Sequence, residues 1–191
     1  MENWRLLNSE QLIVNQWLGV RQDECLTAQG ARVDRYFVVQ KSDYVMIVAI
    51  TRGGELLLVR QYKHPAGEVV VECPAGYVNP GEEPIAAAAR ELYEETGYRP
   101  GTLRPLGDWF SSPAVLTNRA HFFLCTEAER EGEPQFDHAE EIELVTVDFQ
   151  EALRRLPSGA LVSDVSSAAA ILLASRALAA DGGKATSSGR D

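Results

Sequence analysis

Short apolar runs bounded by turn residues fill most of the chain, and this pattern predicts strands. The densest run covers 44–50. After the turn-like segment 52–55 it is followed by a second run over 56–59, so the two runs indicate a hairpin. Further short strands are expected at 12–14, 36–39, 69–71, 103–108, 119–125 and 142–147.

A helical pattern stands out over 84–96. Its apolar positions recur at i, i+3, i+4 and i+7, which places them on one face of a helix. Pro84 suits the first helical turn and Gly97 suits the C-terminal cap. The positions expected on the core-facing stripe are Ile85, Ala88, Ala89, Leu92 and Thr96.

Two more helices are predicted in the C-terminal part of the chain. Asp148 is the expected cap of a short helix that ends before Pro157. Ser163 or Asp164 is the expected cap of a helix that runs to about Ala180. Together, many strands and two or three helices indicate an α/β (α+β) fold in which helices cover a mixed sheet.

The composition divides the chain into three parts. Residues 1–41 are mixed and irregular and are expected to form a small β extension, and 42–180 form the main domain. The segment 181–191 has nothing to bury and is expected to be a disordered tail. With 191 residues, of which 45% are hydrophobic and 24% charged, the chain corresponds to one globular domain with a small appendage.

The charge balance restricts the partners. Lys and Arg number 18 and Asp and Glu number 28, which gives a net charge of −10. Such a surface repels nucleic acid and anionic membranes, whereas a small anionic substrate is compatible when a metal ion inverts the local field. No apolar run approaches bilayer length. The three widely spaced cysteines, and an N-terminus without a signal-peptide pattern, indicate a cytoplasmic protein with reduced thiols.

Three glutamates on the predicted helix carry the chemistry. Glu91, Glu94 and Glu95 fall in one arc beside the apolar stripe, where like charges repel one another. A hard divalent cation such as Mg²⁺ resolves this repulsion, because it binds carboxylate oxygens together with substrate phosphates. The alternative is a solvated acidic helix face. That alternative does not explain why a loop glycine, a distant glutamate, an Arg-Glu step and a closing glycine all fall at fixed intervals.

These intervals resemble the Nudix box, which reads glycine, five residues, glutamate, seven residues, then Arg-Glu-apolar-x-Glu-Glu-x-Gly-apolar. The chain matches the box over 76–97, with Tyr98 where an aliphatic residue is usual. Arg90 and Glu82 are expected to brace the loop 74–77 against the helix. The resemblance implies an α/β/α Nudix sandwich and Mg²⁺-dependent hydrolysis of a nucleoside diphosphate linked to another group.

The resemblance also implies a metal site. Glu91, Glu94, Glu95 and the backbone carbonyl of Ala75 would hold Mg²⁺, with Mn²⁺ as an alternative, and Glu94 also counts among the catalytic candidates. The metals would neutralise the charge on the diphosphate and activate a water for in-line attack.

Three further features resemble the ADP-ribose and nucleoside diphosphate sugar branch of the family. The segment 59–63 is similar to the branch's VRQYR sequence, with Lys63 where arginine is common. Pro113 lies 16 residues after Gly97, at the position of the branch's diagnostic proline. The N-terminal segment is similar to an extra sheet that commonly makes a swapped homodimer. Asn118 and the neighbours of Pro113 depart from the branch's pattern, so other nucleotide sugars stay open beside ADP-ribose.

Candidate contacts follow from the same resemblance. In this branch a glutamate of the loop corresponding to 137–143 places or deprotonates the attacking water, and the candidates are Glu141 or Glu140, then Glu143. An ordinary solvated loop is the alternative. For the substrate contacts, the alternative is that the basic residues are ordinary surface charges and that the aromatic residues belong to the core or to a hairpin. The candidates for substrate binding are Trp17, Tyr36, Lys41, Arg60, Lys63 and Pro113.

The sequence therefore predicts a cytoplasmic Nudix pyrophosphatase that is homodimeric through its N-terminal region. Its expected substrate is ADP-ribose or a related nucleoside diphosphate sugar, cleaved to a nucleoside monophosphate and a sugar phosphate, with no nucleic acid or membrane as partner. One alternative is a Nudix hydrolase of dinucleoside polyphosphates, coenzyme diphosphates or oxidised nucleotides. A second is a ligand-binding regulator without catalysis, but such modules usually lose box carboxylates that this chain keeps.

Overall fold

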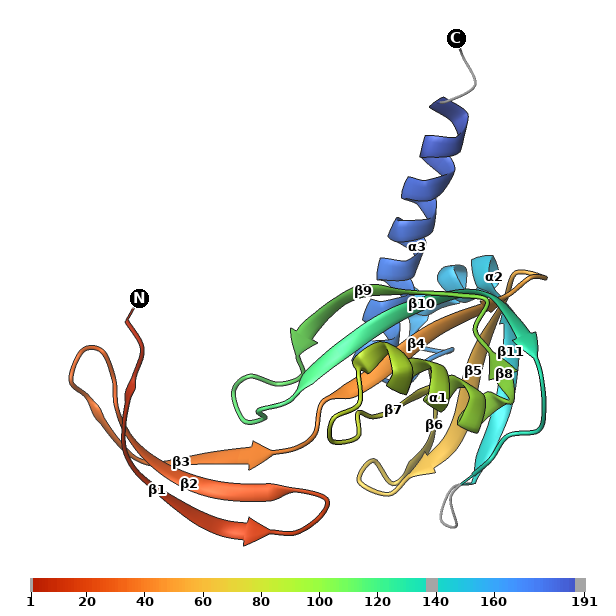
Figure 1. Cartoon of the computed structure of the whole chain (residues 1–191). Coiled ribbons are helices and arrows are strands. Elements are labelled where there is room, and N and C mark those ends of the chain that lie inside the picture. Colours follow the sequence, from red (N-terminus) through yellow and green to blue (C-terminus); the bar gives the residue numbers. More distant parts are fainter. Residues whose placement is uncertain (1, 137–140, 188–191) are drawn as a thin grey trace. The chain divides into compact units, whose positions relative to one another are not determined.

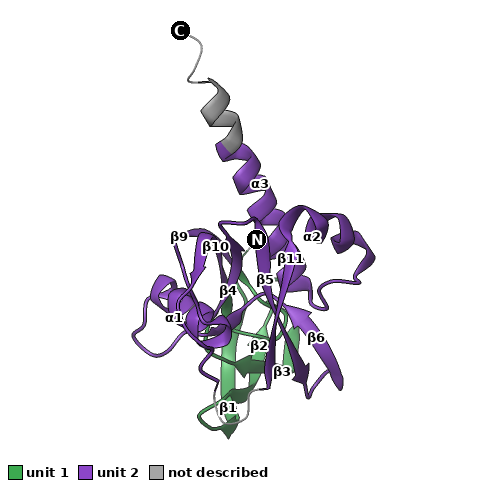
Figure 2. Ribbon diagram, turned by 90° about the vertical axis from the view of Figure 1, so that its right-hand side faces the viewer, with its two compact units in different colours: residues 1–43, 109–120 green, residues 44–108, 121–191 purple. Residues whose placement is uncertain are grey.

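The chain forms two compact units (Figures 1 and 2). The computed structural model describes residues 2–136 and 141–187. The first unit comprises residues 1–43 and 109–120, and the second unit comprises residues 44–108 and 121–191.

The first unit contains a three-stranded antiparallel sheet (Figure 1). Its strands are β1 (Arg5–Val14), β2 (Gly19–Leu26) and β3 (Arg32–Gln40). The sequence predicts only two short strands here, because β2 is largely polar and has no apolar period. Because β2 lies between β1 and β3, backbone pairing on both sides stabilises it as a strand, although its side chains show no strand pattern.

Backbone hydrogen bonds join residues 109–120 to this sheet. Val39 and Leu116 form a parallel bridge. The N–H of Val39 donates to the carbonyl of Val115 at 2.8 Å, and the N–H of Thr117 donates to the carbonyl of Val39 at 3.1 Å. The N-terminal region therefore includes a segment that lies far away in the sequence, which the apolar pattern does not indicate.

The second unit is built on an eight-stranded sheet. Five strands lie in the order β11 (Ile142–Asp148), β5 (Glu55–Lys63), β4 (Tyr44–Thr51), β10 (Arg119–Arg130) and β8 (Tyr98–Arg99). Three further strands, paired with β5, β4 and β10 respectively, are β6 (Glu68–Glu72), β7 (Ala75–Tyr77) and β9 (Thr102–Phe110).

Helices cover both faces of this sheet (Figure 1). They are α1 (Pro84–Thr96), α2 (Phe149–Arg155), the 3-10 turn η1 (Leu156–Ser158) and α3 (Val165–Ser187). Successive residues of β4 point to opposite sides: Val45 and Ile47 share a core with α1, whereas the sulfur of Met46 accepts a hydrogen bond from Ser167 of α3 at 3.7 Å. Burial on both faces explains the continuous apolar run. The predicted α/β/α sandwich is confirmed.

The predicted helix caps near the C-terminus are confirmed. Asp148 accepts a hydrogen bond from the N–H of Glu151, and Asp164 accepts one from the N–H of Ser167, each at 2.8 Å. These bonds satisfy N–H groups that have no partner within their own helix.

The predicted end of α3 is wrong. The helix continues to Ser187, seven residues beyond Ala180. The alanine-rich turns before residue 181 favour propagation of the helix, which offsets a cost of about 1 kcal/mol for each interior glycine. Residues 188–191 lie outside the described part of the chain. Among the described helices, none is long and apolar enough to cross a membrane.

The apolar stripe of α1 differs from the prediction at both of its edges. Ala88, Leu92 and Thr96 are buried as predicted, but Ile85 is exposed. Glu95 is buried, although the prediction places it beside the stripe. The buried arc of the helix is thus rotated toward the glutamates, which brings a carboxylate to the edge of the core.

Candidate active site

The two ends of α1 hold its carboxylates in place. Pro84 occupies the first turn, where its missing N–H removes no helical hydrogen bond. Gly97 has a left-handed φ of 73°, and its N–H donates to the carbonyl of Tyr93 at 2.8 Å. A Cβ at Gly97 would also collide with the backbone carbonyl of Gly132. The sequence predicts both ends, and the structure confirms them.

The glycine of the preceding loop lies directly against α1. Gly76 belongs to β7 and pairs with Val45 of β4. A Cβ on Gly76 would overlap the carboxylate carbon of Glu91. Only glycine therefore lets this backbone approach the carboxylate so closely, which gives the spacing between Gly76 and Glu91 a steric reason.

Glu95 is the most deeply buried of the three glutamates, with 6% of its surface exposed. Its carboxylate accepts a hydrogen bond from the N–H of Ala75 at 2.9 Å. The pKa of Glu95 is raised to about 8, chiefly by burial. The hydrogen bond from the Ala75 N–H and the charge of Lys63 lower this pKa, whereas the charges of Glu91 and Glu72 raise it. A bound cation relieves such a site by stabilising the ionised carboxylate.

Arg90 joins the loop to the helix. Its guanidinium donates to both oxygens of Glu82 at 2.9 Å and to the carbonyl of Tyr77 at 3.0 Å, which confirms the predicted brace. Hydrogen bonds from Arg90 and from the N–H of Asn79 lower the pKa of Glu82 to about 2. The same guanidinium also donates to Glu91 at 2.7 Å and to Glu94 at 2.9 Å.

In this structure Arg90 is the cation that offsets the charge of Glu91 and Glu94. Within the described part of the chain, no group of three or more His, Cys, Asp or Glu side chains has the arrangement of a metal site. A metal ion bound by Glu91 and Glu94 would therefore compete with the guanidinium, and the ligand set stays a prediction. Three observations fit a metal: carboxylate donors, a glycine that lets the loop approach them, and the burial of Glu95.

Glu72, the last residue of β6, is a further candidate for the site, and the sequence motif does not contain it. Its Oε1 accepts hydrogen bonds from Lys63 Nζ at 2.7 Å and from Gln61 Nε2 at 2.8 Å. The available sequence signal was an acidic residue closing the apolar run 69–71, three positions before Ala75. Its importance depends on the pairing of β5 with β6, which the spacing of residues does not reveal.

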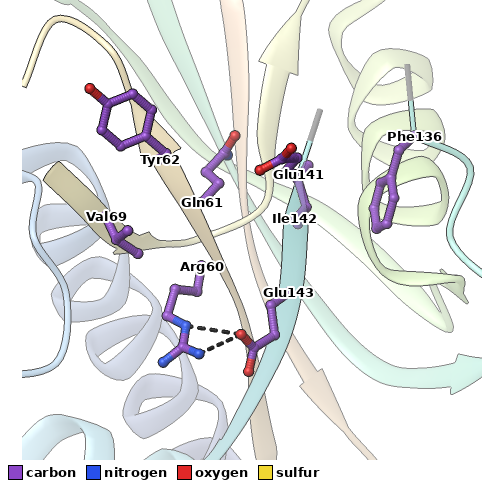
Figure 3. Close-up of a pocket in the computed structure, with 8 residues that line it drawn as sticks. All are labelled: Arg60, Gln61, Tyr62, Val69, Phe136, Glu141, Ile142 and Glu143. Atoms are coloured by element: carbon purple, nitrogen blue, oxygen red, sulfur yellow. Dashed lines mark hydrogen bonds and ion pairs between the residues drawn. The ribbon is translucent and has the colours of Figure 1, made fainter. Parts of the chain in front are cut away.

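A cavity of about 660 Å³ is lined by residues of β5, β6, β11 and the segment before 137 (Figure 3). Arg60 and Glu143 form an ion pair in its lining, with Nε and Oε2 3.1 Å apart. Arg60, a candidate for binding phosphate, is thus neutralised by Glu143, the third candidate for placing or deprotonating the attacking water. Glu141 is exposed and lines the same cavity, whereas Glu140 lies outside the described residues.

The remaining candidates, Trp17, Tyr36, Lys41 and Pro113, belong to the first unit. Trp17 lies between β1 and β2 and is 73% exposed. Tyr36 is engaged within its own unit, because its hydroxyl donates to the carbonyl of Ala114 at 2.8 Å and its ring stands edge-on to Trp4 at 6.0 Å. Trp17 is therefore the better candidate for stacking on a base.

Comparison with known proteins identifies the family. The NUDIX domain matches residues 41–165, so the chain belongs to the Nudix family, as its box predicts. The Nucleoside diphosphate sugar hydrolase N-terminal domain matches residues 4–39, which confirms the resemblance to that branch. Members of the family generally act with a divalent metal ion.

Individual relatives agree with this placement. The chain is 34% identical over 122 residues to an ADP-ribose pyrophosphatase of Bacillus subtilis, an alignment that covers 63% of this chain and 66% of the relative. It is 31% identical over 166 residues to an ADP-ribose pyrophosphatase of Mycobacterium tuberculosis, covering 86% and 80% respectively. The crystal structure of an ADP compounds hydrolase matches the fold with a TM-score of 0.84 at 22% identity, covering 95% of this chain and 97% of the other.

Proposed function

We propose that this chain hydrolyses the pyrophosphate bond of ADP-ribose or a related nucleoside diphosphate sugar to a nucleoside monophosphate and a sugar phosphate. The observation that carries this proposal is the close approach of the Gly76 loop to a complete set of box carboxylates on α1. The N-terminal match to a nucleoside diphosphate sugar hydrolase domain supports the substrate class. A non-catalytic regulator would not need the complete set of box carboxylates on α1.

Glu91, Glu94, Glu95 and the carbonyl of Ala75 are the groups that would hold Mg²⁺, or Mn²⁺ in its place. The burial of Glu95 and the steric requirement at Gly76 support this choice. When bound, the ion supplies charge neutralisation for the diphosphate and a lower pKa for water. The family's general use of a divalent metal agrees with it.

The chain's own side chains would bind the diphosphate and move a proton. Lys63 is a compact positive charge beside the carboxylate cluster and binds a phosphate oxygen. Glu141 is the candidate that accepts a proton from the attacking water, because it is exposed and lines the cavity. Glu143 is a weaker candidate for this role, since Arg60 already holds its carboxylate.

We further propose that a second copy of this chain covers the sheet of the first unit. Apolar side chains of β1 are exposed, among them Leu6, Ile13 and Val14. A three-stranded sheet with this much exposed apolar surface is marginal alone. Trp17 would then stack on the base bound by the other protomer. A cytoplasmic location, expected from three cysteines that are all free, stays a prediction.

A substrate panel with Mg²⁺ tests the activity. Nucleoside diphosphate sugars, dinucleoside polyphosphates, coenzyme diphosphates and oxidised nucleotides are compared at equal concentration, with phosphate release measured after phosphatase coupling. We expect the highest kcat/KM for ADP-ribose or another nucleotide sugar. A higher value for one of the other three classes would refute the substrate assignment, and turnover of none would favour the regulator.

A further inference from the structure

Three polar side chains form a cluster between β5 and β6. A single carboxylate oxygen, Oε1 of Glu72, accepts hydrogen bonds from Lys63 Nζ at 2.7 Å and Gln61 Nε2 at 2.8 Å. The side chain of Glu72 is 13% exposed and that of Lys63 is 43% exposed. The side chain of Glu72 is thus mostly buried, while that of Lys63 is partly exposed.

This cluster borders the carboxylates of α1. Glu72 and Lys63 both influence the pKa of Glu95, in opposite directions, so both charges lie within electrostatic reach of that carboxyl. Along the chain, Glu72 stands three residues before Ala75, whose N–H binds Glu95. Lys63 therefore lies near carboxylates that are proposed to hold the metal.

The bonding pattern leaves Lys63 able to bind a second anion. An ammonium group has three N–H donors, and Glu72 occupies one of them. A lysine on a flexible stem normally samples many rotamers, and ordering it on binding costs conformational entropy. A carboxylate whose same oxygen is also bound by Gln61 restricts those rotamers before the substrate arrives.

We propose that Glu72 is a positioning residue that holds the Lys63 ammonium, with Gln61 as its brace, where it binds an oxygen of the substrate diphosphate. The inference rests on the proposed function and adds a residue outside the Nudix box. This role of Glu72 also explains how a lysine can bind phosphate at a position where arginine is common. The rigid fork of an arginine orients itself on a phosphate, whereas the point charge of a lysine needs a neighbour to place it.

A double-mutant cycle on substrate binding tests this role without turnover. The dissociation constant of ADP-ribose is measured by calorimetry in EDTA for the wild type, Glu72→Gln, Lys63→Met and the double variant. We expect each single substitution to raise Kd by at least about fivefold, because a hydrogen bond to a charged group is lost or misplaced. The double variant should bind within about twofold of Lys63→Met, since Glu72 acts only through Lys63.

A control variant and a replacement variant make the result of the double-mutant cycle interpretable. Glu68→Gln removes an exposed charge from the residue that pairs with Lys63 in the β5–β6 register, and it should leave Kd within about twofold. If Glu72→Gln does not fold, Glu72→Asp replaces it in the cycle, because it keeps the charge but withdraws it by one methylene. The same non-additivity is expected.

Several outcomes overturn the inference. Additive effects in the cycle would mean that Glu72 contacts the substrate itself or only supports the strand pair. An unchanged Kd in Glu72→Gln, or a wild type that does not bind ADP-ribose in EDTA, would contradict it as well. A wild type that binds ADP-ribose but does not hydrolyse it with Mg²⁺ would refute the proposed function instead, and the cycle would still decide the role of Glu72.

Discussion

At the scale of single residues, Glu95 is the carboxylic acid of α1 whose pKa the fold raises. Its pKa is raised from an ordinary 4.5 to about 8, chiefly by burial. Between these two values the folded protein holds a proton on Glu95 that the unfolded chain has released. The folded state then binds more protons than the unfolded state, so the free energy of unfolding falls as the pH rises through this window.

We therefore expect a pH-dependent difference between the wild type and Glu95→Gln in the absence of metal. From about pH 5 to about pH 8 the wild type should lose stability relative to the variant, whose amide does not ionise in this range. Urea unfolding in EDTA at several pH values measures this difference. A difference that stays constant with pH would show that the folded protein does not hold a proton on Glu95 in this pH range.

Gly76 is the second residue with a specific requirement. Gly76→Ala places a methyl group where the Glu91 carboxylate lies, so the carboxylate must move. We expect the half-saturating Mg²⁺ concentration for activity to rise at least about tenfold. The control is Gly53→Ala, whose Cβ would meet no neighbouring atom closer than 3.5 Å. Equal Mg²⁺ dependence in both variants would argue against a metal site at Glu91.

At the scale of secondary structure, the helices follow from local signals that the sequence contains. Helix ends are marked by Pro84, which lacks an N–H that would have no helical partner, and by Gly97, whose N–H binds a carbonyl of the last turn. Asp148 marks the start of α2 by accepting a hydrogen bond from a free N–H of the first turn. The strand β2 has no such signal, because it depends on pairing with strands on both sides. For the same reason the sequence does not predict that 109–120 pairs with the N-terminal region.

The candidate site divides in a similar way. Spacing along one helix and its preceding loop predicts the contact of Arg90 with Glu82. The burial of Glu95 was not predictable, since it depends on how α1 is rotated against the sheet. The contact of Lys63 with Glu72 depends on pairing between two strands, so no fixed interval in the sequence encodes it.

The cap of α2 offers a test at this scale. Asp148→Ala removes the acceptor for the N–H of Glu151, and we expect it to lower the free energy of unfolding by about 1 kcal/mol. Asp148→Asn retains an acceptor at the same place and should cost less. Because α2 carries no proposed site residue, kcat/KM should not change in either variant. Equal stability of the two variants would contradict the cap.

At the scale of the whole molecule, assembly is the property that the exposed sheet predicts. Light scattering at micromolar concentration should give the mass of two chains for the wild type. Ile13→Lys puts a charge among the exposed apolar residues of β1 and should shift the mass to that of one chain. Glu10→Lys, also exposed on β1, is the matched control and should remain dimeric. A monomeric wild type would refute the dimer.

A catalytic metal held by Glu95 is tested by the rate at which Glu95→Gln hydrolyses ADP-ribose at saturating Mg²⁺, measured beside the wild type. The substitution removes the negative charge but keeps an oxygen that can accept the Ala75 N–H. We expect kcat to fall by roughly a hundredfold or more, because a charged metal ligand is lost, while the melting temperature in EDTA does not decrease. A variant that is folded and hydrolyses ADP-ribose at a near-normal rate would contradict the assignment of this carboxylate to a catalytic metal.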